Sequence, residues 1–189
     1  MSNIQGLDRA ITLYNSLKEF LSRKDVVKIL VEQFTSLEVS GVSPTLCLYM
    51  LIYELVDNEA RADGNYTDDE AMILEKITGV HRNIEEQKNR SFLSFSASKQ
   101  VPVAVILTCY ADHKLHKKMK KLTVVDDICE LVDCVAMATA AADGFPVMTE
   151  FIKRLELTKS TRAFIENYKQ KRDVPINWEK IIDLNFYRR

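Results

Sequence analysis

Apolar residues recur every three or four positions along most of the chain, with charged residues between them, which is the pattern of amphipathic helices. This spacing predicts a first helix over residues 4–21, in which Asp8, Lys18 and Glu19 fall between the apolar positions. A second helix is expected over residues 25–41, because Gly41 breaks the apolar run.

A third helix is predicted to begin at the pair Ser43-Pro44. The serine oxygen can accept a hydrogen bond from an otherwise unsatisfied backbone N–H, and the fixed φ of proline suits the first helical position. Residues 46–53 are apolar on all sides, so this helix should lie in the centre of the fold and should end near Asp63.

The next helix has a start signal of two parts. Thr67 and Glu70 have the spacing of a capping box, in which each side chain bonds the backbone N–H of the other residue. Gly79 is the expected end of this helix.

The rest of the chain repeats such signals. Residues 103–107 alone would fit a short strand, but the apolar pattern continues too far for one and favours a helix. Further helices are expected from residue 83, over 103–119, from 123 to 143, around 151–155, over 160–168 and over 178–184. Because no alternating segments meet through a hairpin turn, we predict an all-α fold of about 8–9 helices.

Composition narrows the function classes. Hydrophobic residues make up 47% of the chain and charged residues 28%, and the formal net charge is -1, so we expect a soluble domain and no dedicated nucleic-acid or membrane-surface binder. The five glycines are too scattered to form a Rossmann or P-loop phosphate cradle, which leaves no organic cofactor to expect. No uncharged apolar stretch reaches the roughly 18 to 20 residues of a membrane span.

The four cysteines favour a reducing compartment. They lie in apolar, helix-like stretches without metal-site spacing, so free thiols are expected. The first residues show no basic and apolar signal-peptide pattern. The expected location is therefore cytoplasmic.

One pattern occurs twice. The Asp-Gly pair at Asp63 recurs 80 residues later at Asp143, and in each copy an Ala-x-Ala-Asp-Gly segment precedes a glutamate, Glu70 or Glu150, in the first turn of the next helix. We therefore expect one helical domain over residues 1–189, with an internal repeat over 24–79 and 101–158, two halves related by a pseudo-twofold axis, and a C-terminal helical extension over 159–189.

This repeated Ala-Asp-Gly-x(5)-Glu pattern, each time after an apolar helix, resembles the tellurite-resistance TerB-like family. The resemblance covers residues 26–157. It implies an all-helical protein whose acidic residues at the two turns bind metal ions in bacterial stress responses linked to tellurite and phage resistance. By position, the implied ligands are Asp63, Glu70, Asp143 and Glu150.

The first turn can be compared with the twelve-residue calcium loop of an EF-hand. With glycine at position six, Asp63 falls at position five, Asn65 at seven and Glu70 at twelve, which gives two carboxylates and a backbone carbonyl. Position three is Arg61, a cation where calcium requires oxygen. Calcium or magnesium is the expected ion, and a site shared between the two halves stays open.

The second turn is poorer in ligands, because residues 145–148 are apolar and only Asp143 and Glu150 supply carboxylates. A purely structural interpretation applies to both turns: the aspartates would accept backbone N–H bonds, and the glycines would take positive φ.

The remaining candidate residues favour structural roles over metal binding or catalysis. His113 and His116 could share a metal on one helix face, but the lysines between Lys114 and Lys121 would repel a cation, so a solvated basic face is favoured. This face could meet phosphate or an acidic partner, and the basic C-terminal tail is expected to be a solvated surface. Cys134 has no histidine near it in the sequence to activate it, so a core thiol is expected.

The expected function is that of a cytoplasmic, non-enzymatic TerB-like protein that binds a divalent cation and presents helical surfaces to partner proteins. The alternative is a metal-free helical adaptor whose Asp-Gly turns are structural. A metal-dependent hydrolase lacks any HExxH-type motif. The sequence leaves the oligomeric state open.

Overall fold

A computed structural model describes residues 4–34, 41–61, 66–81, 83–85, 101–119, 121–142, 148–178 and 180–181, with the side chains of 148–158 excepted. These residues form seven helices and no strand, which confirms the all-α prediction. The helices are α1 (Leu7–Ser22), α2 (Lys24–Gln33), α4 (Pro44–Ala60), α5 (Asp68–Thr78), α7 (Val103–Leu115), α8 (Val124–Ala142) and α9 (Met148–Gln170).

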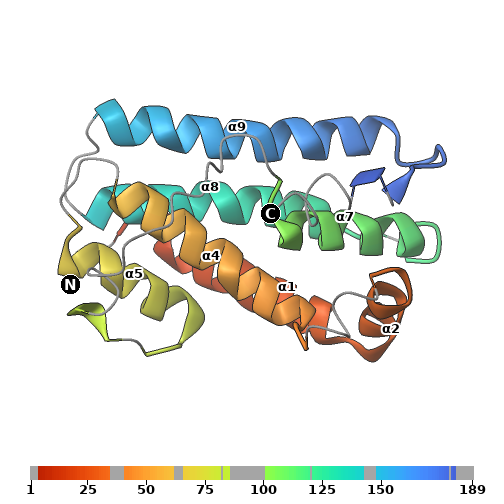
Figure 1. The fold of residues 1–189 in the computed structure, drawn as a ribbon, viewed down its shortest axis with the longest axis horizontal. Helices are drawn as coiled ribbons and strands as arrows, with labels where there is room; N and C mark the ends of the chain where they lie inside the picture. Colours follow the sequence, from red (N-terminus) through yellow and green to blue (C-terminus); the bar gives the residue numbers. More distant parts are fainter. Residues whose placement is uncertain are drawn as a thin grey trace.

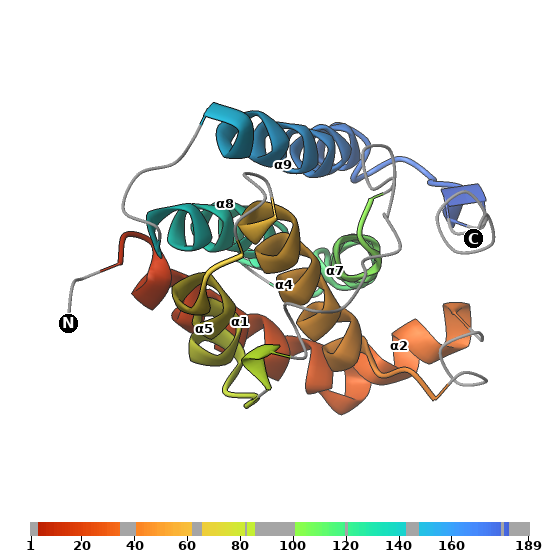
Figure 2. The same cartoon turned by 60° about the vertical axis from the view of Figure 1, so that its left-hand side comes forward.

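Two apolar helices, α4 and α8, pack against each other in the middle of the molecule, and each also contacts α1, α5, α7 and α9 (Figures 1 and 2). Helix α9 lies along one side of α8, and α1 lies on the other (Figure 1). Ile52 and Val56 of α4 are fully buried, as are Ile128 and Val135 of α8. The central position predicted for α4 is therefore confirmed, with Leu46 (43% exposed) and Met50 (41% exposed) on its outer side.

The helix start predicted at Ser43-Pro44 is formed by the expected residues, whereas α2, predicted from residue 25, begins at Lys24 without a side-chain cap. Ser43 accepts a hydrogen bond from the backbone N–H of Leu46, 3.1 Å away, and Pro44 is the first residue of α4. At the end of α5, Gly79 has φ 70°, a left-handed conformation that L side chains rarely adopt.

The expected number of helices was too high over the C-terminal part. The segments around 151–155 and over 160–168 belong to one continuous helix, α9. No glycine or proline occurs between Met148 and Gln170, so no residue of this stretch forces a break in the helix. Helix α7 also ends at Leu115, four residues earlier than predicted. The region from residue 86 to 100 lies outside the described residues, as does most of 178–184.

The helix boundaries follow the sequence repeat. Helices α4 and α8 start at Pro44 and Val124, 80 residues apart, and α5 and α9 start at Asp68 and Met148, with the same separation. Helices from the two repeats thus begin at corresponding sequence positions.

Candidate functional site

At the first turn, Glu70 is the only predicted ligand that lies within the described residues; Asp63 and Asn65 lie outside them. Glu70 is fully buried in the first turn of α5. Its Oε2 accepts hydrogen bonds from the Thr67 backbone N–H (2.9 Å) and from the Thr67 hydroxyl (3.0 Å). The Thr67 oxygen in turn accepts from the Glu70 N–H at 3.2 Å, so the capping box is confirmed and one carboxylate oxygen of Glu70 serves it.

Two further carboxylates are buried near the end of α4, Asp57 and Glu59. Arg61 Nε donates to Asp57 Oδ2 over 2.9 Å, while Oδ1 of Asp57 is buried and has no hydrogen-bond partner among the described residues. Burial raises the pKa of Asp57, and Arg61 opposes this increase. The guanidinium of Arg61 also lies 5.0 Å from the ring centre of Tyr66.

The second turn is less fully described. Asp143 lies outside the described residues, and Glu150 is in the first turn of α9 with its side chain outside them. Within the described part of the chain, no group of three or more His, Cys, Asp or Glu side chains is placed to hold a metal ion. A cation site at these turns would therefore need ligands beyond the described side chains, such as Asp63, Asn65, Asp143 or Glu150.

The two histidines of the basic segment do not lie on a solvated face as expected. Both are partly buried, because the chain that follows α9 packs on them. His113 Nδ1 lies 3.2 Å from the backbone carbonyl of Arg172, and His116 Nε2 lies 3.3 Å from Asp173 Oδ1. The hydrogen bond to His116 lowers the pKa of Asp173. Lysines 114, 117, 118 and 121 are exposed, and Lys120 lies outside the described residues.

A buried polar cluster ties α7 to the end of α9. Asp112 is fully buried; the Tyr168 hydroxyl donates to its Oδ2, and Arg172 Nη2 donates to its Oδ1 over 2.5 Å. Burial and the bond to Asp112 raise the pKa of Tyr168. The partners are 56 and 60 residues from Asp112 in the sequence, and no local pattern joins them, so sequence reasoning missed this cluster.

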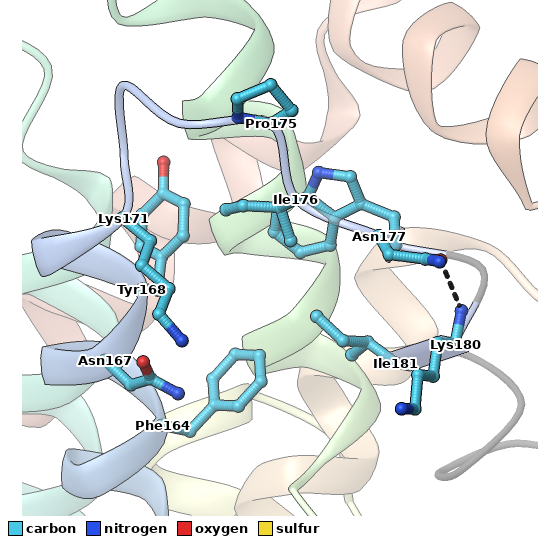
Figure 3. A pocket seen from close by; sticks show the side chains of 10 residues that line it. Phe164, Asn167, Tyr168, Lys171, Pro175, Ile176, Asn177, Lys180 and Ile181 are labelled. Atoms are coloured by element: carbon cyan, nitrogen blue, oxygen red, sulfur yellow. Dashed lines mark hydrogen bonds between the residues drawn. The ribbon is translucent and has the colours of Figure 1, made fainter.

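A groove of about 500 Å³ lies beside this cluster, between α9 and the segment from Pro175 to Ile181 (Figure 3). The only tryptophan of the chain, Trp178, forms part of its wall. The Trp178 ring centre lies 5.2 Å from that of Tyr110, 5.6 Å from that of His113 and 6.0 Å from that of Tyr168. Aromatic packing and the Asp112 cluster thus hold one wall of the groove in place.

The cysteines of the chain are free thiols. Burial raises the pKa of Cys134, and it raises the pKa of Cys47 to about 11. A nucleophilic thiol requires a lowered pKa, so these surroundings do not activate either cysteine.

Comparison with known protein families, curated proteins and solved structures gives no match to this chain. Among the described helices, none combines the length and the apolar character needed to cross a bilayer.

Proposed function

We propose that this protein is a non-enzymatic, TerB-like helical module of the cytoplasm that binds a divalent cation, calcium or magnesium, at the turn between α4 and α5 and acts in a stress response through partner proteins. Asp63 and Glu70 would be the side-chain ligands, and Asn65 would provide a backbone carbonyl.

Buried Asp57 carries this proposal. Its side chain is fully buried at the end of α4 that leads into the turn, and Oδ1 has no hydrogen-bond partner among the described residues. A buried carboxylate is unfavourable unless opposite charge or hydrogen-bond donors compensate it. Arg61 supplies one such donor to Oδ2. A cation held by the adjacent residues 62–65 would add positive charge where Asp57, Glu59 and Glu70 are buried.

We also infer that the two repeats are pseudo-symmetric copies of one helix arrangement. The equal spacing of α4 from α8 and of α5 from α9 supports this. Asp143 and Glu150 would then stand at the turn that corresponds to Asp63 and Glu70. Because residues 145–148 are apolar, we expect this second pair to bind a cation more weakly.

The capping box favours a second candidate function, that of a metal-free adaptor with structural turns. Glu70 Oε2 already accepts two hydrogen bonds from Thr67, which gives this carboxylate a role without a cation. The ion pair between Asp57 and Arg61 can likewise be purely structural.

The test is the thermal unfolding of chelator-treated protein with calcium, magnesium, manganese or zinc added singly. A cation present at 100 times its dissociation constant should stabilise the folded protein by about 2.7 kcal/mol. We expect Asp63→Asn and Glu70→Gln each to abolish this increment in stability on cation addition. Glutamine can still accept the capping bonds, so Glu70→Gln removes the charge and retains the helix start.

The matched control is Asp69→Asn, which removes an exposed carboxylate from the same helical turn and should keep the full increment. The pair Asp143→Asn/Glu150→Gln tests the second turn. Absence of an increment with every ion, or an equal increment in Asp63→Asn, would reject the cation site and support the metal-free adaptor.

A further inference from the structure

The groove between α9 and residues 175–181 combines an apolar lining with positive charge. Phe164, Ile176 and Ile181 contribute apolar side chains, and the charged residues among those that line it are Lys171 and Lys180 (Figure 3). Among the described residues that line the groove, none carries a carboxylate.

The two lysines differ from their neighbours in charge pairing. Lys169 is paired with Asp126 at 2.5 Å, and Lys117 with Asp173 at 3.8 Å. Lys171 and Lys180 are exposed, and neither forms an ion pair with another described residue. The positive charge of the groove is therefore not balanced from within the described part of the chain.

Polar groups suited to a peptide backbone lie in the same groove. Asn167 is exposed on α9, and Asn177 accepts a hydrogen bond from the Lys180 backbone N–H through Oδ1 (3.0 Å). The amide nitrogen of Asn177 is thus left to act as a donor. Side-chain amides can bond both the N–H and the C=O groups of an extended segment.

We propose that this groove binds a short acidic peptide segment of a partner protein, with an aliphatic or aromatic side chain inserted beside Phe164 and acidic residues facing Lys171 and Lys180. Because Lys171 and Lys180 are both positively charged, a partner segment of complementary charge is acidic. The wall formed by Tyr168 and Trp178 is preorganised by the Asp112 cluster, which lowers the ordering cost of binding. The assignment depends on the interaction role proposed above and is independent of the cation site.

The geometry favours a peptide over a membrane or a nucleic acid. The groove is apolar with charges at its side, so it accommodates a protruding side chain. Binding to a bilayer surface requires a broader basic face. The groove also has two lysines for charge contact, while tight binding to a phosphate backbone uses many such contacts.

The experiment uses the emission of Trp178, which reports on the groove alone because the chain has one tryptophan. The full-length protein is titrated in chelator with the peptide Glu-Asp-Leu-Phe-Glu-Glu. Control peptides replace either the acidic residues by lysine or the Leu-Phe pair by Ser-Ser. We expect saturable binding of the first peptide only, weakened as the salt concentration rises.

The variant Lys171→Glu/Lys180→Glu should weaken this binding about tenfold or more, because two favourable charge contacts become repulsive. Lys24→Glu/Lys76→Glu makes the same change in charge on α2 and α5 and should leave the affinity unaltered. Phe164→Ala should also weaken binding by removing the apolar contact, and the unfolding midpoint of each variant verifies that it is folded.

Three results would overturn the assignment: no saturable response with any peptide, an equal loss in the α2 and α5 variant, or a Trp178 response to phosphatidylserine vesicles without one to the acidic peptide. Because chelator is present throughout, these results are separate from the cation test. If cations stabilise the protein but the acidic peptide does not bind, the peptide-binding role of the groove is rejected and the cation site at the first turn is not.

Discussion

The surroundings of His113 show how one residue joins α7 to the chain beyond α9. Burial lowers its pKa from 6.5, and the nearby Lys114 and His116 act in the same direction. The Arg172 carbonyl and Asp112 oppose this shift. The Trp178 ring also packs against the imidazole. The neutral form, with Nδ1–H donating to the Arg172 carbonyl, is therefore the one that the fold favours.

This preference predicts a loss of stability in mild acid. The unfolded chain takes up a proton on His113 near pH 6.5, whereas the folded protein resists it, so this stabilisation is present above pH 6.5 and is lost as the pH falls through the folded pKa. Asp173 has a lowered pKa, so its contribution is lost only at pH values below its ordinary 3.8. We expect the unfolding midpoint to drop between about pH 7.5 and 5.5.

The measurement compares the wild type with His113→Gln, which can still donate to the Arg172 carbonyl but cannot titrate. Its midpoint should change less with pH over the same range. The control His81→Gln alters an exposed imidazole that is paired with Glu75 and should keep the dependence of the wild type. An identical pH profile in His113→Gln would contradict this interpretation.

Among the helices, α5 has the most complete set of local determinants. Thr67 and Glu70 satisfy each other's backbone N–H groups at its start, and Gly79 ends it in a left-handed conformation. We expect Thr67→Ala to destabilise the protein by about 1 kcal/mol, within the range of 0.5–2 found for such caps. Chemical denaturation measures this cost.

Thr12→Ala is the matched control for the cap. Thr12 is exposed within α1 and donates to the Asp8 carbonyl at 2.9 Å, a bond that competes with helix geometry, so its replacement should change stability by less than about 0.5 kcal/mol. Equal effects of the two substitutions would show that the capping box adds no specific stabilisation.

These helix ends also show what the sequence can predict. Ser43-Pro44 and Thr67 with Glu70 act through contacts three residues apart, so their pattern alone specifies them. The continuity of α9 was missed, although no glycine or proline within Met148–Gln170 signals a helix end. Partnerships across the fold depend on packing: no local rule connects Asp112 with Tyr168, and none could predict the groove that Trp178 completes.

The packing of α4 on α8 joins the two repeats into one core. Ion pairs at the surface also cross between helices, such as Arg9 with Glu130 at 2.6 Å, but exposed pairs contribute only about 0–1 kcal/mol. The apolar contact between α4 and α8 is therefore expected to contribute more to holding the helices together than such ion pairs do. Loss of packing in either central helix should destabilise both repeats together.

We therefore expect Ile52→Ala in α4 and Ile128→Ala in α8 each to lower the midpoint of one common unfolding transition. Both side chains are fully buried, so each truncation should cost about 2–5 kcal/mol. Met50→Ala, at a position in α4 that is 41% exposed, should cost much less. Scanning calorimetry tests the coupling, because a single cooperative unit has equal calorimetric and van't Hoff enthalpies. If Ile128→Ala instead splits the transition and leaves one part at the wild-type temperature, the two repeats unfold independently, and the α4–α8 interface is not their common core.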